Sequence, residues 1–115
     1  MPRGFDEQEL LERVDNDWEF LGETVQMLAT DGPALLREIR RAAEAGDALT
    51  VGRAAHALKG MISNFSAPAA HAGAAELERL GKAGDLSPAP QTLGKLESDL
   101  EALITDLTDF LATRA

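Results

Sequence analysis

Residues 48–65, which read ALTVGRAAHALKGMISNF, decide the fold of this chain. Their apolar residues recur at steps of three and four, the spacing of one face of an α-helix. Neither this stretch nor its neighbours show the period-two alternation of a half-buried strand. The segment therefore predicts an amphipathic helix with one continuous core-facing stripe, which consists of Ala48, Val51, Ala55, Leu58, Ile62 and Phe65.

The same helical spacing extends upstream of this stretch. A short amphipathic segment is predicted over residues 6–13, and a long one follows from Trp18 to Ala43. Within the long segment, Asp31-Gly32-Pro33 is expected to interrupt or kink the helix, because proline lacks a backbone donor. Gly46 and Asp47 then indicate a helix stop followed by the cap of the next helix.

Downstream, two further helices are predicted. Ser66-Ala67-Pro68 marks a turn, after which residues 70–80 continue as a shorter helix with a narrow face of small residues. The glycines and prolines of residues 81–90 predict a loop. Residues 93–110 carry leucines at steps of three and four and predict the last helix.

Four long amphipathic helices with short connections predict an all-α fold, an up-down antiparallel four-helix bundle with a short additional N-terminal helix. Neither an internal repeat nor a linker divides the 115 residues, so residues 1–115 are expected to form a single domain. Leucine and alanine dominate the apolar residues and aromatics are scarce, which also favours helix. A monomer is expected, because no additional apolar face is evident.

Composition narrows the classes of function. There is no cysteine, so disulfides and thiolate chemistry are excluded. The net charge of −9 argues against nucleic acid as a partner, which requires basic residues to neutralise phosphates. The charge is uneven: residues 1–31 carry −7, residues 32–84 carry +2 and residues 85–115 carry −4. No segment has the length of a signal peptide core or a membrane span, so no membrane association and a cytoplasmic location are expected.

One polar residue on the decisive helix stands out. His56 lies one step off the apolar stripe, and its neighbours at three and four residues are Gly52, Arg53, Lys59 and Gly60. Glycines one turn away on either side would leave the imidazole accessible, and the two cations would stabilise an anionic group on the ring. A neutral histidine is a competent nucleophile near neutral pH. An ordinary surface histidine with charged neighbours is the alternative interpretation.

Residues 55–60, AHALKG, resemble the signature of histidine-containing phosphotransfer (HPt) domains, and Asn64 and Phe65 fit the same pattern. The flanking segments AAEAGD at residues 42–47 and ELERLGKAGD at residues 76–85 are similar to the family as well. The resemblance covers nearly the whole chain. It implies a four-helix bundle that serves as an intermediate in a bacterial two-component phosphorelay.

The resemblance also implies roles for individual residues. His56 would accept the phosphoryl group, Lys59 would stabilise it and Gly60 would leave room for it. The chain would be a phosphocarrier rather than an enzyme and would bind no cofactor, since a partner receiver domain supplies the aspartate and Mg²⁺. Receiver domains of response regulators or hybrid histidine kinases would donate and accept the phosphoryl group. The expected docking residues around His56 are Gly52, Arg53, Ala57, Met61, Ser63 and Asn64.

Two positions depart from the family pattern. Ser66 stands where a glycine is usual, and Met61 stands where small residues are common. A variant of the fold that binds its partner without transferring phosphate is therefore one alternative. A non-catalytic helical adaptor is another, and a metal site built from His56, His71 and Glu78 is a third. No metal is expected, because no two potential ligands have the local spacing of a metal motif.

Overall fold

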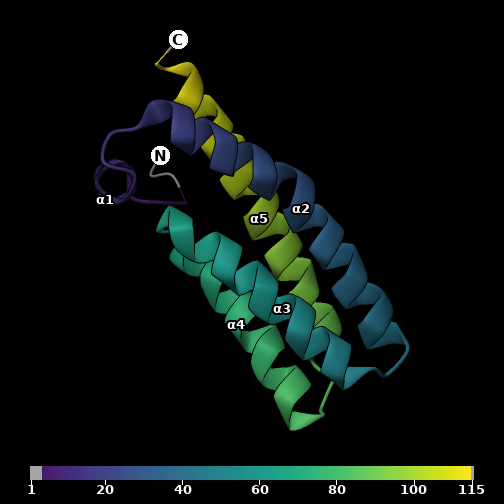
Figure 1. The fold of residues 1–115 in the computed structure, drawn as a ribbon. Coiled ribbons are helices and arrows are strands. Elements are labelled where there is room, and N and C mark those ends of the chain that lie inside the picture. Colours follow the sequence, from purple (N-terminus) through teal and green to yellow (C-terminus); the bar gives the residue numbers. More distant parts are fainter. Residues whose placement is uncertain (1–3, 115) are drawn as a thin grey trace.

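The computed structural model describes residues 4–114 and shows a helical bundle. Four long helices lie side by side and alternate in direction, and no strand occurs in the described range (Figure 1). This architecture confirms the all-α prediction. The elements are α1 (Glu7–Arg13), α2 (Trp18–Glu44), α3 (Ala48–Ile62), the 3-10 turn η1 (Ser63–Phe65), α4 (Pro68–Ala83) and α5 (Ala89–Ala112).

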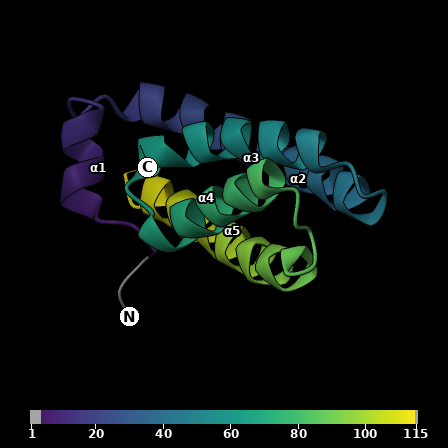
Figure 2. The same cartoon turned by 90° about the horizontal axis from the view of Figure 1, so that it is seen from below.

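The helices pack in a ring. α3 contacts α2 on one side and α4 on the other, and α5 closes the ring against α2 and α4. The short helix α1 lies across one end of the bundle (Figure 2). It is tied to the α3–α4 connection by Arg13, whose Nε donates to Ser66 Oγ at 2.8 Å. The predicted additional N-terminal helix therefore covers an end of the bundle rather than adding a fifth parallel member.

Local signals in the sequence explain where the helices begin and end. Asp47 caps α3, and its carboxylate accepts from the backbone N–H of Thr50 at 3.1 Å. α4 begins at Pro68, a residue suited to the first helical turn, and ends before Gly84, which adopts a left-handed φ of 72°. The cap at Asp47 sets the start of α3 and with it the register that turns His56 outward.

The core is built from the predicted stripes. Leucines from all four long helices fill it, together with alanines where α3 and α4 approach each other. No helix within the described residues is both long and apolar enough to cross a membrane. The largest side chains that are fully buried are Phe65, Leu10, Leu21, Leu28, Ile39, Leu58, Ile62, Leu77, Leu80, Leu93, Leu96 and Leu100.

The interruption predicted at Asp31-Gly32-Pro33 is wrong, because α2 continues through Pro33; the kink predicted as the other outcome stays a prediction. A proline at this position leaves only the carbonyl of Ala29 without its helical donor, and Ala29 is exposed to water. The preceding Gly32 is buried, and a Cβ there would lie 3.2 Å from Leu100 Cδ2. Gly32 thus allows α2 to pack closely on α5 and does not break the helix.

Two boundaries on either side of α4 also differ from prediction. The helix that carries His56 ends at Ile62, and Phe65, the last residue of its predicted stripe, lies in η1. The loop predicted over residues 81–90 is shorter, since α4 runs to Ala83 and α5 begins at Ala89. The glycine at position 81 was interpreted as a stop signal, whereas in the structure it is buried inside α4.

Candidate functional site

His56 lies in the middle of α3 and points out of the bundle beside α4. Its side chain is 69% exposed, so the ring is accessible to a large partner. The neighbouring stripe residues Ala55 and Leu58 are completely buried and hold the backbone of the helix in place. An exposed imidazole on a rigidly packed helix therefore meets the first requirement for a group acceptor.

Glu78 of α4 approaches the ring from the neighbouring helix. It is the one charged residue in the described range that is buried, with 6% of its surface exposed. Its Oε2 lies 2.8 Å from His56 Nδ1 and 3.2 Å from Lys82 Nζ, and its Oε1 lies 2.6 Å from Lys59 Nζ. A buried carboxylate that is shared by two cations and an imidazole is well compensated for the loss of water.

These contacts keep the Glu78 carboxylate ionised. The hydrogen bond from Lys59 is the largest influence on the pKa of Glu78, and those from His56 and Lys82 act in the same direction. Burial opposes them, and the net effect lowers the pKa to about 2 from an ordinary value of 4.5. Glu78 is therefore a carboxylate, and only an acceptor of hydrogen bonds, throughout the physiological range.

The ionised Glu78 determines the proton position on His56. Since a carboxylate only accepts, the 2.8 Å contact requires Nδ1 of His56 to carry the proton and to donate it. In the neutral ring the lone pair then resides on Nε2. The arrangement resembles the general pattern in which a carboxylate orients a histidine and selects its tautomer. Nε2 is accordingly the ring nitrogen that is free to act as a nucleophile in a neutral ring.

Lys59 and Gly60 occupy the positions that the sequence predicted for them. The Lys59 side chain is 29% exposed and lies on the same side of α3 as His56, bound to Glu78. Gly60 is exposed, and a Cβ at this position would meet no atom within 4 Å. The structure thus shows open space at Gly60, which agrees with the expected role in access.

Gly52 has a packing role that the sequence did not predict, while its expected role in access stays a prediction. It lies against Gly81 of α4, where the two helices approach each other closely. A Cβ on Gly81 would lie 2.5 Å from the Gly52 nitrogen and 2.8 Å from the Ala48 carbonyl oxygen, so that position excludes a side chain. The glycine pair brings α4 close enough to α3 for Glu78 to reach His56.

The other expected docking residues are spread over the surface around the ring. Arg53 and Ala57 are exposed on either side of His56, and Met61 is half-buried against the core. The Ser63 hydroxyl donates to the Gly60 carbonyl at 2.8 Å, so it closes the end of its own helix. Asn64 is exposed in η1, two helical turns beyond His56.

The structure does not bring His71 to His56. His71 lines a separate hollow with Arg13 of α1, Ser66 and other residues near the start of α4. Within residues 4–114 there is no group of three or more histidine, cysteine, aspartate or glutamate side chains placed to hold a metal ion. The alternative of a metal site built from His56, His71 and Glu78 therefore loses its geometric basis.

The sequence indicated that a neighbouring helix could bring His71 or Glu78 towards the face of His56, and only Glu78 lies there; Lys82 was not predicted. One signal was available, since Glu78 follows Ala74 by four residues and so falls beside the core stripe of α4, where a charged residue needs a partner. Lys82 follows Glu78 by another four residues, the spacing of an ion pair on a helix. Their approach to His56 depends on the packing of α4 on α3, which spacing alone does not supply.

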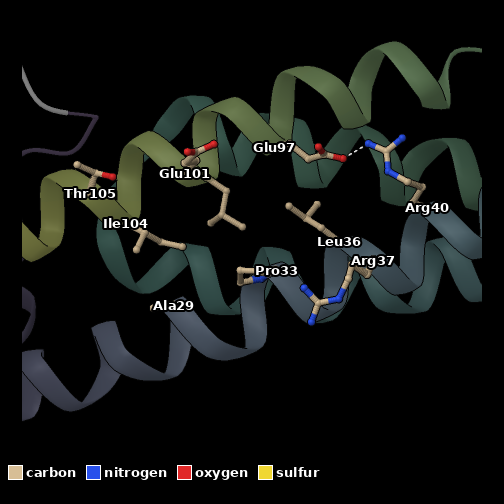
Figure 3. A pocket seen from close by; sticks show the side chains of 10 residues that line it. Ala29, Pro33, Leu36, Arg37, Arg40, Glu97, Glu101, Ile104 and Thr105 are labelled. Atoms are coloured by element: carbon tan, nitrogen blue, oxygen red, sulfur yellow. Dashed lines mark ion pairs between the residues drawn. The ribbon is translucent and has the colours of Figure 1, made fainter.

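A larger groove lies away from this site, between α2 and α5 (Figure 3). Pro33, Leu36 and Ile104 contribute its apolar surface, and an ion pair between Arg40 and Glu97 spans it. All its lining residues belong to α2 and α5, whereas the contacts of His56 described above lie on α3 and α4. The groove is consequently separate from the candidate site.

Comparison with known proteins places this arrangement in a family. The sequence model of the Hpt domain matches residues 23–106, which include all the residues around His56 described above. The chain belongs to the Hpt domain family. Such domains are phosphocarriers that work with receiver domains in two-component phosphorelays, and the chain accordingly has a phosphotransfer role in two-component signalling.

Among solved structures, the chain is similar to the histidine-containing phosphotransfer protein B (HptB) from Pseudomonas aeruginosa PAO1. The TM-score is 0.89, the alignment covers 98% of each chain, and 22% of the aligned residues are identical. At this level of identity the similarity shows that the fold is shared. No curated protein matches the sequence significantly.

Proposed function

We propose that this chain is a phosphorelay intermediate that accepts a phosphoryl group on His56 Nε2 from a receiver-domain aspartate and passes it to another receiver domain. The observation that carries the proposal is the 2.8 Å contact between His56 Nδ1 and the buried Glu78, on a ring that is 69% exposed. This contact leaves the nucleophilic nitrogen facing solvent, where a partner can approach it. In this proposal residues 1–115 act as one monomeric unit in the cytoplasm.

The transfer would proceed by in-line displacement at phosphorus. Nε2 of His56 attacks the phosphoryl group, the N–P bond forms, and the P–O bond to the receiver aspartate breaks to release its carboxylate. The phosphorylated ring is cationic, because Nδ1 keeps its proton. The Glu78 carboxylate, 2.8 Å away, stabilises that positive charge without taking the proton. The reverse sequence returns the phosphoryl group to a second receiver.

The two lysines would neutralise the transferred group. Lys59 and Lys82 both contact Glu78 in the structure, at 2.6 and 3.2 Å, so both cations are close to the ring before any phosphoryl group arrives. A flexible ammonium group can move from a carboxylate to a phosphoryl oxygen by rotation of its own side chain. Mg²⁺ bound by the partner receiver would neutralise the remaining charge, and this chain would hold no cofactor itself.

The proposal is tested by transfer of labelled phosphate from a panel of phosphorylated receiver domains, with a His56→Gln variant as the control. We expect acid-labile, base-stable label on the wild-type chain alone, and an unchanged helical circular dichroism spectrum for the variant, because His56 is exposed. Label on the variant would assign the acceptor elsewhere. Absence of label from every receiver, with a folded protein, would favour a helical adaptor or a phosphotransfer-inactive HPt.

A further inference from the structure

A hollow adjoins His56 on the side toward the start of α3. Gly52 and Gly81 form its floor where α3 and α4 cross, and it measures about 320 Å³. Its surface is mostly carbon, and it opens to solvent. The two glycines face each other's helix at this crossing, and the depression lies beside their contact. Its remaining lining residues are Ala48, Leu49, Arg53, His56, Glu78 and Lys82.

An exposed leucine stands at the rim of this hollow. Leu49 is 63% exposed, the largest exposed fraction among the large apolar side chains in the described range. An apolar side chain beside an apolar depression is the arrangement found where a partner buries a protruding side chain. The hollow has room for a leucine-sized group, and its openness suits a side chain on a protein surface better than an enclosed small molecule.

Two cations flank the same hollow. Arg53 is exposed, and its charge acts on the nearby Asp47 without a hydrogen bond or close ion pair in the range 4–114. Lys82 is 75% exposed, and its ammonium group pairs with Glu78. The segment that contains the site, residues 32–84, carries +2 in a chain whose net charge is −9. A partner that presents an acidic surface to His56 would be attracted to this positive rim.

We propose that the hollow floored by Gly52 and Gly81 receives an apolar side chain of the receiver domain, with acidic groups beside it that pair with Arg53 and Lys82. The inference rests on the proposed function and adds the place on this chain where the receiver domain binds. Bound in this way, a receiver is held immediately beside the ring, and its position along α3 is set by the fit of one side chain. The hollow would therefore contribute to the choice among receivers.

Two variants test the apolar rim of the hollow. Leu49→Ser removes the apolar side chain, and Leu49→Asp places a negative charge that repels an acidic partner. Two matched controls accompany them. Leu49→Met keeps an apolar rim, and Ala102→Asp places the same charge on the exposed side of α5. Circular dichroism and thermal unfolding verify that all four variants are folded.

The measured quantity is the concentration dependence of phosphoryl transfer from a receiver that is active with the wild-type chain. We expect Leu49→Ser and Leu49→Asp each to lower kcat/KM by about tenfold or more, mainly through KM, with the rate at saturating receiver within about twofold of wild type. Both controls should retain wild-type kcat/KM. An equal kcat/KM in all variants, or a loss confined to the saturated rate, would overturn the proposal.

Light scattering of the same samples tests whether a second copy of this chain, and not a receiver domain, occupies the hollow. A wild-type dimer that Leu49→Asp converts to a monomer would assign the hollow to a second copy of this chain and contradict docking of a receiver there. Failure of the underlying function is distinguishable, because the wild-type chain itself would then take no label from any receiver. In that case the inference is overturned together with the proposed function.

Discussion

At the scale of single residues, Glu78 organises the site. It is 6% exposed, and its carboxylate accepts a hydrogen bond from His56 and forms ion pairs with Lys59 and Lys82. It fixes the tautomer of the ring and holds both cations close by. Glu78 is thus a positioning residue, while His56 carries the bond that is made and broken in the proposed reaction.

Lys59→Ala is expected to slow transfer by about tenfold to a hundredfold, since one charge-assisted hydrogen bond to a phosphoryl oxygen is worth about 1.5–3 kcal/mol. Rapid-quench measurement of the transfer rate checks this. Lys95→Ala on α5 is the matched control and should leave the rate unchanged, because Lys95 pairs with Asp99 away from the site. Equal rates for Lys59→Ala and wild type would remove Lys59 from the mechanism.

The lowered pKa of Glu78 predicts a defined response to acid. Its ionised contacts stabilise the folded state fully above its ordinary pKa of 4.5, and this contribution is lost as the pH falls toward the folded value of about 2. The difference in the free energy of unfolding between wild type and Glu78→Gln should be constant above pH 4.5 and should shrink below it. Urea unfolding at a series of pH values measures this difference.

Glu101→Gln, an exposed carboxylate on α5, serves as the control for that series. It should show little difference from wild type at any pH. A Glu78→Gln difference that persists undiminished down to pH 2.5 would contradict the link between the ion pairs and stability.

At the scale of elements, the crossing of α3 and α4 builds the site. Residues 48–56 of α3 and residues 78–82 of α4 approach each other closely only because glycines occupy the crossing point. This closeness puts a carboxylate from one helix within hydrogen-bond distance of an imidazole on the other. The hollow of the proposed docking lies beside this same crossing.

Gly81→Ala should therefore damage the site although alanine favours helix. The added Cβ would lie 2.5 Å from the Gly52 nitrogen, and the clash is with backbone, so α4 must shift away from α3. We expect a destabilisation of about 1–3 kcal/mol and a weaker contact between His56 and Glu78. Thermal unfolding and the imidazole ¹⁵N shifts measure the two effects.

Gly60→Ala, on α3, is the opposite case. Its Cβ would meet nothing within 4 Å, so it should stabilise the protein by up to about 1 kcal/mol. If both glycine variants were equally stable, the close crossing would not be a constraint on Gly81.

At the scale of the whole molecule, the bundle holds α3 in place, while the face of α3 that carries His56 stays exposed to solvent. The core of leucines and alanines runs through all four long helices and includes the inner faces of both helices that carry the site. Because the core is shared, a substitution in a helix far from His56 is expected to lower stability without changing the chemistry of the ring.

Leu100→Ala tests this separation. Leu100 is 1% exposed, and its truncation should cost about 2–5 kcal/mol of unfolding free energy. Transfer to or from His56, measured well below the unfolding temperature, should stay close to wild type. Leu49→Ala, at an exposed leucine, should change stability by no more than about 0.5 kcal/mol. A small loss for Leu100→Ala would indicate that the core is less tightly packed than described.

The class of fold, the helix that carries His56 and the outward direction of that residue were all predictable from the sequence. These follow from local periodicity and capping, which depend on residues a few positions apart. Pro33 and Gly81 were misjudged, since both residues disfavour helix locally and only packing against α5 and α3 accounts for them.

Only the tertiary structure decided the surroundings of the ring. Glu78 lies 22 residues from His56 in the chain, and no local pattern relates the two positions. The separation of His71 and the hollow on Gly52 and Gly81 likewise depend on how helices cross. The physical reason is that hydrophobic periodicity specifies which face of a helix is buried, whereas the contacts between polar groups on different helices depend on the distance and angle at which those faces meet.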